Sequence, residues 1–355
     1  MDEAPGMESR AGILETILVA ELSANHNQRL QLAMDTIAAA KECGADAVKV
    51  QTYTPDTMTI DSRERWFIVG GGTPWDGTNL YDLYRQAYTP WEWHEDLKRA
   101  AERAGLLFFS TPFDRSSADF LEKLGVPMYK IASFELNDTP FVEYVARKGK
   151  PMIMATGLAD LEIIERALAA CRRAGNTDIT LLKCTSAYPA PFEEVNLRTM
   201  VDMRERFHVN VGVSDHTPGI AVPVAAAALG ASMIEKHFIL DRRIGGPDAS
   251  FSLEPAEFRA MAQAIRQATA ALGAVTYELT PSMRATRVFA RSLFVVRDMR
   301  AGDRFTPDNV RSIRPGYGMD PARIDDVIGK RAKRDIARGT PLTGDMVEDL
   351  ERRTS

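Results

Sequence analysis

The chain has 355 residues, of which 45% are hydrophobic and 26% charged, and its formal net charge is −5. This is an ordinary globular composition, with enough apolar residues for a large core and enough length for two domains. The charges do not form the strongly basic surface that nucleic-acid binding requires, and no apolar run is long enough to cross a membrane. The three cysteines form no disulfide framework, and the first residues are not a secretory signal. We therefore expect a cytoplasmic protein.

Eight short apolar runs recur along the chain, and each ends in polar or charged residues. A stretch with helical periodicity follows nearly every run. The runs close at Glu21, Gln51, Thr111, Ile131, Thr156, Cys184, His216 and His237. This alternation predicts an α/β fold of the (β/α)8 TIM-barrel type, in which catalytic groups lie at the carboxyl ends of the strands. Helices are expected over residues 30–43, 91–104, 117–124, 140–146, 161–174, 196–206, 220–229 and 255–272.

One connection is much longer than the others. Residues 52–90 separate the second strand from its helix, and they carry three tryptophan or phenylalanine residues, four tyrosines and a glycine triplet at 70–72. Long loops on the catalytic face of a barrel are usually functional. Two interpretations stay open. The aromatic residues stack on a sugar and the glycines act as a hinge, or the segment is a packed cover over the barrel mouth.

The barrel pattern stops near Gly273. Residues 274–287 are expected to be a polar linker, and short strands alternate with turn residues after it. We expect a barrel domain over residues 1–273 and a small second domain over 288–355. Residues 281–355 carry 16 Lys and Arg against 11 Asp and Glu, whereas residues 1–280 carry 28 against 38. Such asymmetry is typical of a tail that docks onto the acidic body or onto a neighbouring subunit, although it also arises by chance.

Two of the five histidines close adjacent strands. Parallel strands lie about 4.8 Å apart, so His216 and His237 can share a divalent cation at the barrel mouth. The competing interpretation is a pair of hydrogen-bonded core histidines. His26 follows the first strand, where it contacts substrate or fixes the loop. His94 and His208 lie in helical segments and are expected to be inert.

Two lysines lie inside apolar strands. Lys49 and Lys130 need an anionic partner because an unpaired buried charge is very costly. The partner is either a strand carboxylate such as Glu21 or a bound phosphate. The same mouth carries a ring of hydroxyls, on Thr111, Ser133, Thr156, Ser186 and Ser214. Two cations and several hydroxyls suit a small phosphorylated carboxylate. Purely structural Lys–Glu pairs and a Schiff-base aldolase, which also uses a strand lysine, are the alternatives.

A series of short motifs along the chain indicates a protein family. The motifs are ELSANHN (21–27), STPF (110–113), YKIAS (129–133), CTSAYP (184–189), GVSDHT (212–217), EKHF (235–238) and GPD (246–248). By their order and spacing the chain resembles the sialic acid synthase family. Its C-terminal part resembles the family's antifreeze-like (SAF) domain, with RPGYG (314–318) as signature. The segment WDG (75–77) and the aromatic residues around it resemble the pseudaminic acid synthase branch.

The resemblance implies condensation of phosphoenolpyruvate with an open-chain amino sugar to a nine-carbon 2-keto acid. For the pseudaminic branch the sugar is 2,4-diacetamido-2,4,6-trideoxy-L-altrose. Synthases for N-acetylneuraminate or legionaminate are the alternatives within the family. A metal-dependent aldolase that uses free pyruvate and a non-catalytic carbohydrate-binding protein are the alternatives outside it.

The resemblance also assigns roles to residues. Phosphoenolpyruvate would be held by Lys49, Thr111, Lys130, Ser133, Ser186 and Ser214, and Mn²⁺ or Mg²⁺ by His216 and His237. Glu21 would act at the reacting centre together with the two lysines and the two histidines. The sugar would contact Asn25, Tyr188, Asp248 and Arg314, the last reaching from the SAF domain of one subunit into the barrel of the other in a domain-swapped homodimer. Ala155 and Ser186 stand where sialic acid synthases typically have serine and asparagine.

Overall fold

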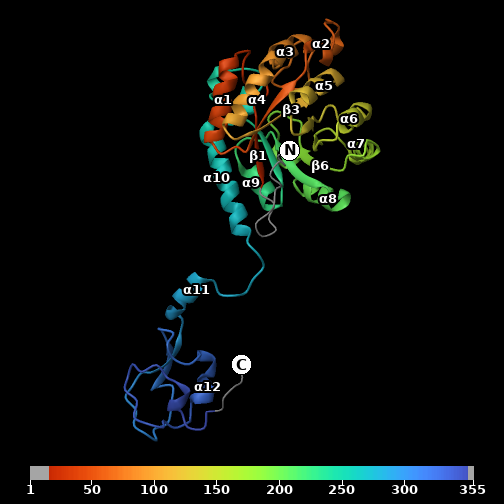
Figure 1. Ribbon diagram of the computed structural model, residues 1–355. Helices are drawn as coiled ribbons and strands as arrows, with labels where there is room; N and C mark the ends of the chain where they lie inside the picture. The colour runs from red at the N-terminus through yellow and green to blue at the C-terminus, as the bar shows by residue number, and fades with distance from the viewer. Residues whose placement is uncertain (1–15, 351–355) are drawn as a thin grey trace. The chain divides into compact units, whose positions relative to one another are not determined.

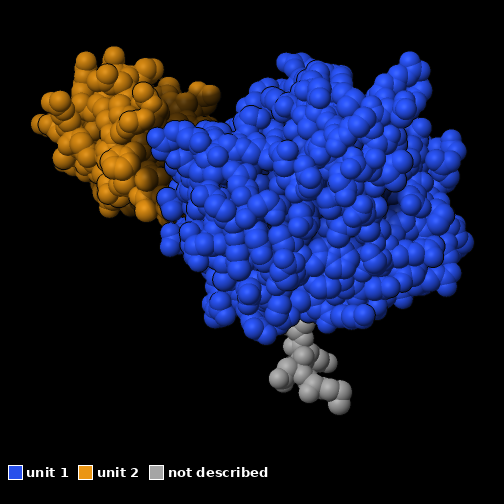
Figure 2. Space-filling model, turned by 90° about the horizontal axis from the view of Figure 1, so that it is seen from above, with its two compact units in different colours: residues 1–273 blue, residues 274–355 orange. Residues whose placement is uncertain are grey.

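The computed structural model describes residues 16–350, so the outermost ends of the predicted domains, at residues 1–15 and 351–355, lie outside the described residues. The chain forms two compact units that divide between Gly273 and Ala274 (Figure 2). No helix in the described part is long and apolar enough to cross a membrane.

The first unit is a closed barrel of eight parallel strands surrounded by helices (Figure 1). Neighbouring strands in the chain are neighbours in the barrel, and the last strand pairs with the first. The predicted TIM-barrel fold is therefore confirmed. The strands are β1 (Ile17–Glu21), β2 (Ala47–Thr52), β3 (Leu107–Pro112), β4 (Tyr129–Ile131), β5 (Met152–Ala155), β6 (Ile179–Cys184), β7 (Asn210–Asp215) and β8 (Met233–His237).

Eight helices lie close to the predicted ranges. They are α1 (Leu30–Glu42), α4 (His94–Arg103), α5 (Arg115–Leu124), α6 (Thr139–Ala146), α7 (Leu161–Arg173), α8 (Arg198–Phe207), α9 (Ala221–Ala228) and α10 (Pro255–Leu272). Local sequence signals set several of their ends. Asp114 caps α5 by accepting from the N–H groups of Ser116 and Ser117, and Gly125 ends the same helix in the left-handed conformation, with φ of 76°.

The long connection after β2 is partly helical. It contains α2 (Pro55–Met58), a 3-10 turn at Arg65–Phe67 and α3 (Leu80–Ala87). The indole N–H of Trp75 donates to the carbonyl of Pro247, 2.8 Å away, in the loop after β8. The middle of the long connection is thus tied across β1 to the loop after β8.

Side chains alternate along each strand between the barrel interior and the helix layer, as the period of a β-strand requires. The outward residues and the helices form the large apolar core. The inward residues begin with a small apolar layer at the amino ends of the strands, made by Val19, Ala47, Phe109, Ile153, Leu182 and Met233. This apolar layer closes the barrel interior at the amino ends of the strands. The polar inward residues lie two positions further along the strands, so they rest on a closed floor and do not line an open channel.

The second unit has its own core. Two antiparallel strands, β9 (Ser292–Val295) and β10 (Val310–Ile313), and a short helix α12 (Ile324–Val327) surround buried residues that include Leu293, Phe305 and Leu342. The stretch expected to be a linker contains the helix α11 (Pro281–Thr286), which begins where the Thr280 hydroxyl accepts from the N–H of Met283. A threonine cap followed by proline at the first helical position explains this start.

Close packing inside the barrel leaves no space for a side chain at Gly212 in β7. A Cβ atom there would lie closer than 3.0 Å to the carbonyl oxygen of Met233 and to Leu182. We expect Gly212→Ala to destabilise the protein by about 1–3 kcal/mol, because backbone cannot yield as a side chain can. Urea unfolding measures this. The control is Gly70→Ala, at an exposed position with open space around it, which should change stability by less than about 0.5 kcal/mol. Equal effects of the two substitutions would contradict the packing argument.

Candidate active site

Four charged side chains form the layer above the apolar floor. Lys49 Nζ lies 2.7 Å from Glu21 Oε2 and 3.6 Å from Glu235 Oε1, and Lys130 Nζ donates to both oxygens of Glu235 at 2.9 Å. All four residues are at most 4% exposed. The hydroxyls of Thr111 and Ser214 complete the layer, since Lys49 donates to the first and the second donates to Glu235. Five of the predicted site residues are therefore brought together here.

The two carboxylates of this layer differ in protonation. Burial alone would raise the pKa of Glu235, but Lys130 and Lys49 lower it to about 2. Burial raises the pKa of Glu21 to about 7, although Lys49 acts in the opposite sense. Glu235 is the permanent anion between the two lysines, whereas Glu21 gains or loses a proton near neutral pH.

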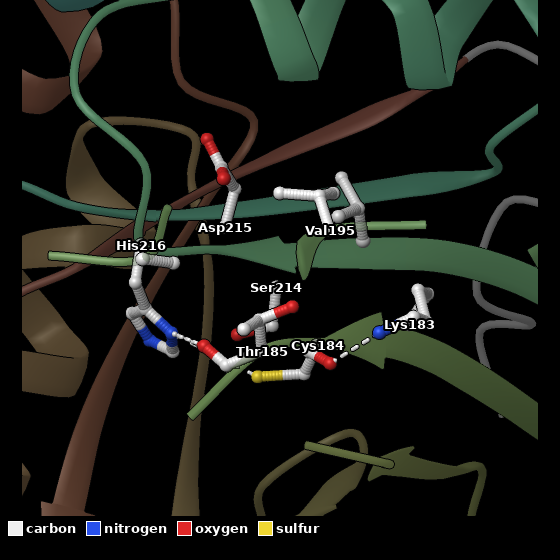
Figure 3. A pocket seen from close by; sticks show the side chains of 9 residues that line it. Lys183, Cys184, Thr185, Val195, Ser214, Asp215 and His216 are labelled. Atoms are coloured by element: carbon white, nitrogen blue, oxygen red, sulfur yellow. Dashed lines mark hydrogen bonds between the residues drawn. The ribbon is translucent and has the colours of Figure 1, made fainter. Parts of the chain in front are cut away.

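The next layer contains the two predicted histidines. The rings of His216 and His237 have centroids 5.3 Å apart. The Nδ1 atom of His216 lies 3.0 Å from the carbonyl oxygen of Thr185 (Figure 3). Since a carbonyl only accepts, Nδ1 carries a proton, and in the neutral ring Nε2 has the lone pair. Nδ1 of His237 is buried without a hydrogen-bond partner and lies 3.9 Å from Asp248 Oδ2.

Ser133, Gly157 and Ser186 come close together at the ends of β4, β5 and β6. Ser133 Oγ accepts from the N–H of Gly157 at 3.0 Å. A Cβ on Gly157 would collide with the side-chain oxygens of Ser133 and Ser186 and touch the sulfur of Cys184. Because glycine has no side chain, these polar atoms can approach its backbone closely. Two more of the predicted phosphate-contacting residues, Ser133 and Ser186, converge there.

An aromatic wall stands over the histidine layer. Tyr188 has its ring centroid 4.4 Å from that of His216, 5.2 Å from that of Trp75 and 5.1 Å from that of Phe251. Trp75 comes from the long connection after β2, so that segment contributes directly to the wall of the site. Trp75 is therefore packed into the mouth, as the interpretation of a packed cover requires, and it lies beside Tyr188. The interpretation that the aromatic residues stack on a sugar stays a prediction.

Comparison with known proteins shows the family of this chain. The family model described as "NeuB family" matches residues 36–277, and that of the SAF domain matches residues 290–348. The chain belongs to the NeuB family. The predicted family resemblance and the predicted SAF domain are both confirmed by these matches.

Several relatives cover almost the whole chain. The pseudaminic acid synthase of Helicobacter pylori is 47% identical over 93% of this chain and 97% of its own length. The N,N'-diacetyllegionaminic acid synthase of Legionella pneumophila is 36% identical over 97% of this chain and 98% of its own. Among solved structures, an N-acetylneuraminic acid synthetase from Leptospira borgpetersenii in complex with citrate matches with a TM-score of 0.68 and 28% identity, covering 78% of this chain and 94% of that one.

Some predicted site residues of this NeuB-family chain have other partners. The side-chain nitrogen of Asn25 donates to Phe238 O and Ser252 Oγ, both at 2.9 Å, so its donors hold the β1 and β8 loops together. His26 is buried, and its Nδ1 accepts from the N–H of Gln28 within the same loop. This fixes the loop, which was one of its two expected roles. Arg314 is exposed and belongs to the second unit, directly after β10.

The remaining histidines and Thr156 lie away from the barrel's charged layer. His94 begins α4, is fully buried and bonds Thr52 Oγ1 at 2.7 Å. His208 is exposed and ends α8 in the left-handed conformation. Thr156 Oγ1 donates to the carbonyl of Leu182 on the next strand. These three residues have structural partners.

Two acidic residues at the carboxyl end of the barrel were not among the predicted site residues. Glu235 binds both lysines, and its signal was the two-residue spacing to His237, which puts both on the same side of β8. Glu135 follows β4 and is largely buried, which raises its pKa to about 7, and its Oε2 has no hydrogen-bond partner. No pattern in the sequence distinguishes Glu135 from an exposed loop carboxylate. Gln51 was also missed as a partner of Glu21 and Ser23.

The raised pKa of Glu21 predicts how stability depends on pH. The carboxyl has a folded-state pKa of about 7 against an ordinary value of 4.5, so between these values the folded protein holds a proton that the unfolded chain has lost. This contribution to stability is complete below pH 4.5 and is lost as the pH rises through 7. Glu21→Gln should remove it and flatten the dependence.

The measurement is urea unfolding of both proteins at pH 5, 6, 7 and 8. The control is Glu205→Gln on the exposed side of α8, which should leave the wild-type dependence intact. Parallel pH dependence of wild type and Glu21→Gln would show that Glu21 does not take up a proton in this range.

Proposed function

We propose that this chain is a pseudaminic acid synthase, which condenses phosphoenolpyruvate with open-chain 2,4-diacetamido-2,4,6-trideoxy-L-altrose and water to give pseudaminic acid and phosphate. The observation that carries the proposal is the buried pair of lysines beside two histidines at the carboxyl ends of a NeuB-family barrel. Lys49 and Lys130 are 4% and 2% exposed, and the polar groups around them form a site for a small, highly charged anion. Relatives that bear the name pseudaminic acid synthase support the choice of sugar.

Phosphoenolpyruvate would bind by exchange of partners. Without ligand, the positive charges of Lys49 and Lys130 face Glu21 and Glu235. An anion that enters this layer offers both lysines new partners. The phosphate would lie against the hydroxyls of Ser133 and Ser186, and the hydroxyls of Thr111 and Ser214 lie beside the lysines.

We propose that His216 and His237 bind a divalent metal, Mn²⁺ or Mg²⁺. The structure offers two observations that fit this role. His216 keeps Nε2 free because Nδ1 donates to Thr185, and the buried Nδ1 of His237 lacks a partner. No group of three or more metal-binding side chains was found among the residues described, so substrate oxygens or water would complete the coordination. When bound, the metal supplies Lewis-acid polarisation of the sugar aldehyde.

The protein groups then account for the rest of the reaction. The lysines hold phosphoenolpyruvate so that its methylene carbon attacks the aldehyde carbon and a C–C bond forms. The former enol carbon becomes positive, and the Glu21 carboxylate stabilises it. The π electrons of the aldehyde C=O bond move to its oxygen, which takes a proton from the water that adds to the former enol carbon. The hydroxyl formed on that carbon passes its proton to the phosphate as the C–O bond to phosphate breaks. Phosphate leaves with that bond's electron pair, and the 2-keto group remains. Asp248 and Tyr188, which lie next to the two histidines, would orient the sugar.

We also propose a homodimer in which the SAF domain of one copy completes the sugar site of the other through Arg314. The barrel exposes three large apolar side chains on the loops after β4, β5 and β6, namely Phe134, Leu158 and Phe192. Tyr317, three residues after Arg314, is 66% exposed. A partner that covers such residues would remove apolar surface from water. The three buried free cysteines fit a reducing compartment, and we propose the cytoplasm.

Phosphate release with a panel of sugars tests the chemistry and the substrate together. The protein is incubated with phosphoenolpyruvate, Mn²⁺ and one sugar: the diacetamido altrose, N-acetylmannosamine or the legionaminic precursor. We expect release only with the altrose. Release with another sugar would keep the mechanism and make this a neuraminate or legionaminate synthase. No release from folded, metal-loaded protein would favour a carbohydrate-binding protein, and turnover of free pyruvate an aldolase.

Glu21 is expected to be required for turnover but not for the fold. Glu21→Gln removes the charge that stabilises the positive carbon, so the turnover number should fall by at least about 10²-fold. In the wild type, kcat/KM should fall as the pH drops below about 7, because the free enzyme then protonates Glu21. Phosphate release across pH 5.5–8.5 measures both effects. Near-normal turnover of the variant would remove Glu21 from the mechanism.

A further inference from the structure

A second buried ion pair lies on strands β7 and β8, behind the histidines. Lys236 Nζ is 2.6 Å from Asp215 Oδ2, and the two side chains are 0% and 2% exposed. The same ammonium donates to the carbonyl oxygen of Thr217. Asp215 in turn accepts from both the N–H and the hydroxyl of Thr217, each at 3.0 Å. None of the predicted site residues takes part in these contacts.

The pair faces away from the site. Ser214 and Glu235 bond each other inside the barrel, and Asp215 and Lys236 are the next residues on the two strands, so alternation directs them to the helix side. Figure 3 shows the Asp215 carboxylate pointing to the opposite side of β7 from the His216 ring. The residues after the pair, His216 and His237, return to the inner side.

Burial of this pair needs a reason other than stability. Removing two charges from water is expensive, and apolar residues of similar size in such places are often neutral or stabilising. What a buried pair provides is a fixed geometry, because each charge must stay with its partner. In this protein the pair fixes the register of β7 and β8 where their pairing ends, since Asp215 and Lys236 are the last Cα partners of the two strands.

Lys236 is connected to both histidines: its ammonium binds the residues on either side of His216, and His237 follows it in the chain. Its ammonium binds Asp215 and Thr217, the residues immediately before and after His216, and its own backbone leads directly into His237. The His216 ring has a further support, the carbonyl of Thr185. The His237 ring packs against Phe251, with ring centroids 4.9 Å apart, but it has no hydrogen-bond partner at Nδ1, so the backbone that carries it contributes more to its position.

We propose that the Lys236–Asp215–Thr217 cluster is a positioning device that sets the spacing of His216 and His237 and thereby the affinity of the site for a divalent metal. The inference rests on the proposed metal site. Neither Lys236 nor Asp215 touches metal or substrate in this proposal. They act through the backbone of the two strand ends, as outer residues that orient the ligands of a metal.

The test measures Mn²⁺ binding directly, by titration of the full-length protein with Mn²⁺ and detection of free ion by electron paramagnetic resonance. Lys236→Met removes the clamp and leaves Asp215 charged. The double variant Asp215→Asn with Lys236→Met leaves no buried charge and keeps an oxygen for the N–H of Thr217. We expect both variants to bind Mn²⁺ about 10- to 100-fold more weakly than wild type.

The matched control is Lys148→Met. Lys148 is also a largely buried lysine, 7% exposed at its side chain, and it pairs with Asp119 at 2.6 Å and Glu122 at 2.7 Å, among the outer helices of the same barrel. Loss of this pair affects stability but does not involve β7 or β8. Its Mn²⁺ affinity should equal that of the wild type. Phosphoenolpyruvate affinity, which depends on the inner lysines, should be the same in all variants.

The outcomes separate this inference from the proposed function. If wild-type protein binds no Mn²⁺, the proposed metal site is wrong and the positioning role with it. If wild type binds Mn²⁺ and Lys236→Met binds it equally well, the positioning role alone is wrong. Should Lys236→Met fail to fold, the double variant decides. Wild-type affinity in the double variant would mean that the pair only neutralises its own charges, whereas weakened affinity would support the clamp.

Discussion

The closed barrel forces every ionised group in its interior to find a partner, and the site follows from this constraint. Lys49, Lys130, Glu21 and Glu235 occupy one layer above an apolar floor, where no water shell is available to four charges. Each lysine of the layer faces at least one carboxylate. An incoming anion therefore replaces one set of charge contacts by another, and the barrel never has to hold an isolated ammonium. The same exchange explains why one carboxylate is strongly acidic and the other titrates near neutral pH.

The barrel itself could be predicted almost completely from the sequence, because strand and helix periods are local properties. Helices α1, α7 and α10 begin at the predicted residue, and each of the eight strands lies at a predicted apolar run. The grouping of Lys49, Lys130 and Glu21 was also accessible, since inward residues recur with a period of two. What the sequence could not supply was the stagger of strands around the barrel. That stagger makes Glu235 the shared partner of both lysines, and no spacing along one strand reports it.

Residues that connect distant loops were the hardest to interpret. Asn25 stands in a motif that suggested a substrate contact, yet its side-chain nitrogen holds the loops after β1 and β8 together. Trp75 shows the converse. It belongs to the segment 52–90, for which a packed cover and a sugar site were equally good predictions. Its hydrogen bond to Pro247 places it against Tyr188. Both assignments depend on contacts more than 170 positions apart in the chain, which local patterns do not encode.

Strands β7 and β8 show how one pair of strands serves the interior and the exterior of a barrel at once. Their inner residues bind the lysines and present the histidines, and their outer residues should only pack against helices. Asp215 and Lys236 break that rule by placing a charged pair in the apolar outer layer. A Val–Ile pair would suffice for packing. It would allow the strand ends to shift, however, because apolar contacts are not directional. The charged pair does not allow this shift, because Lys236 binds both Asp215 and the backbone carbonyl of Thr217, on either side of His216. The pair lies directly behind the histidines, so its rigidity fixes the spacing of the two imidazole rings.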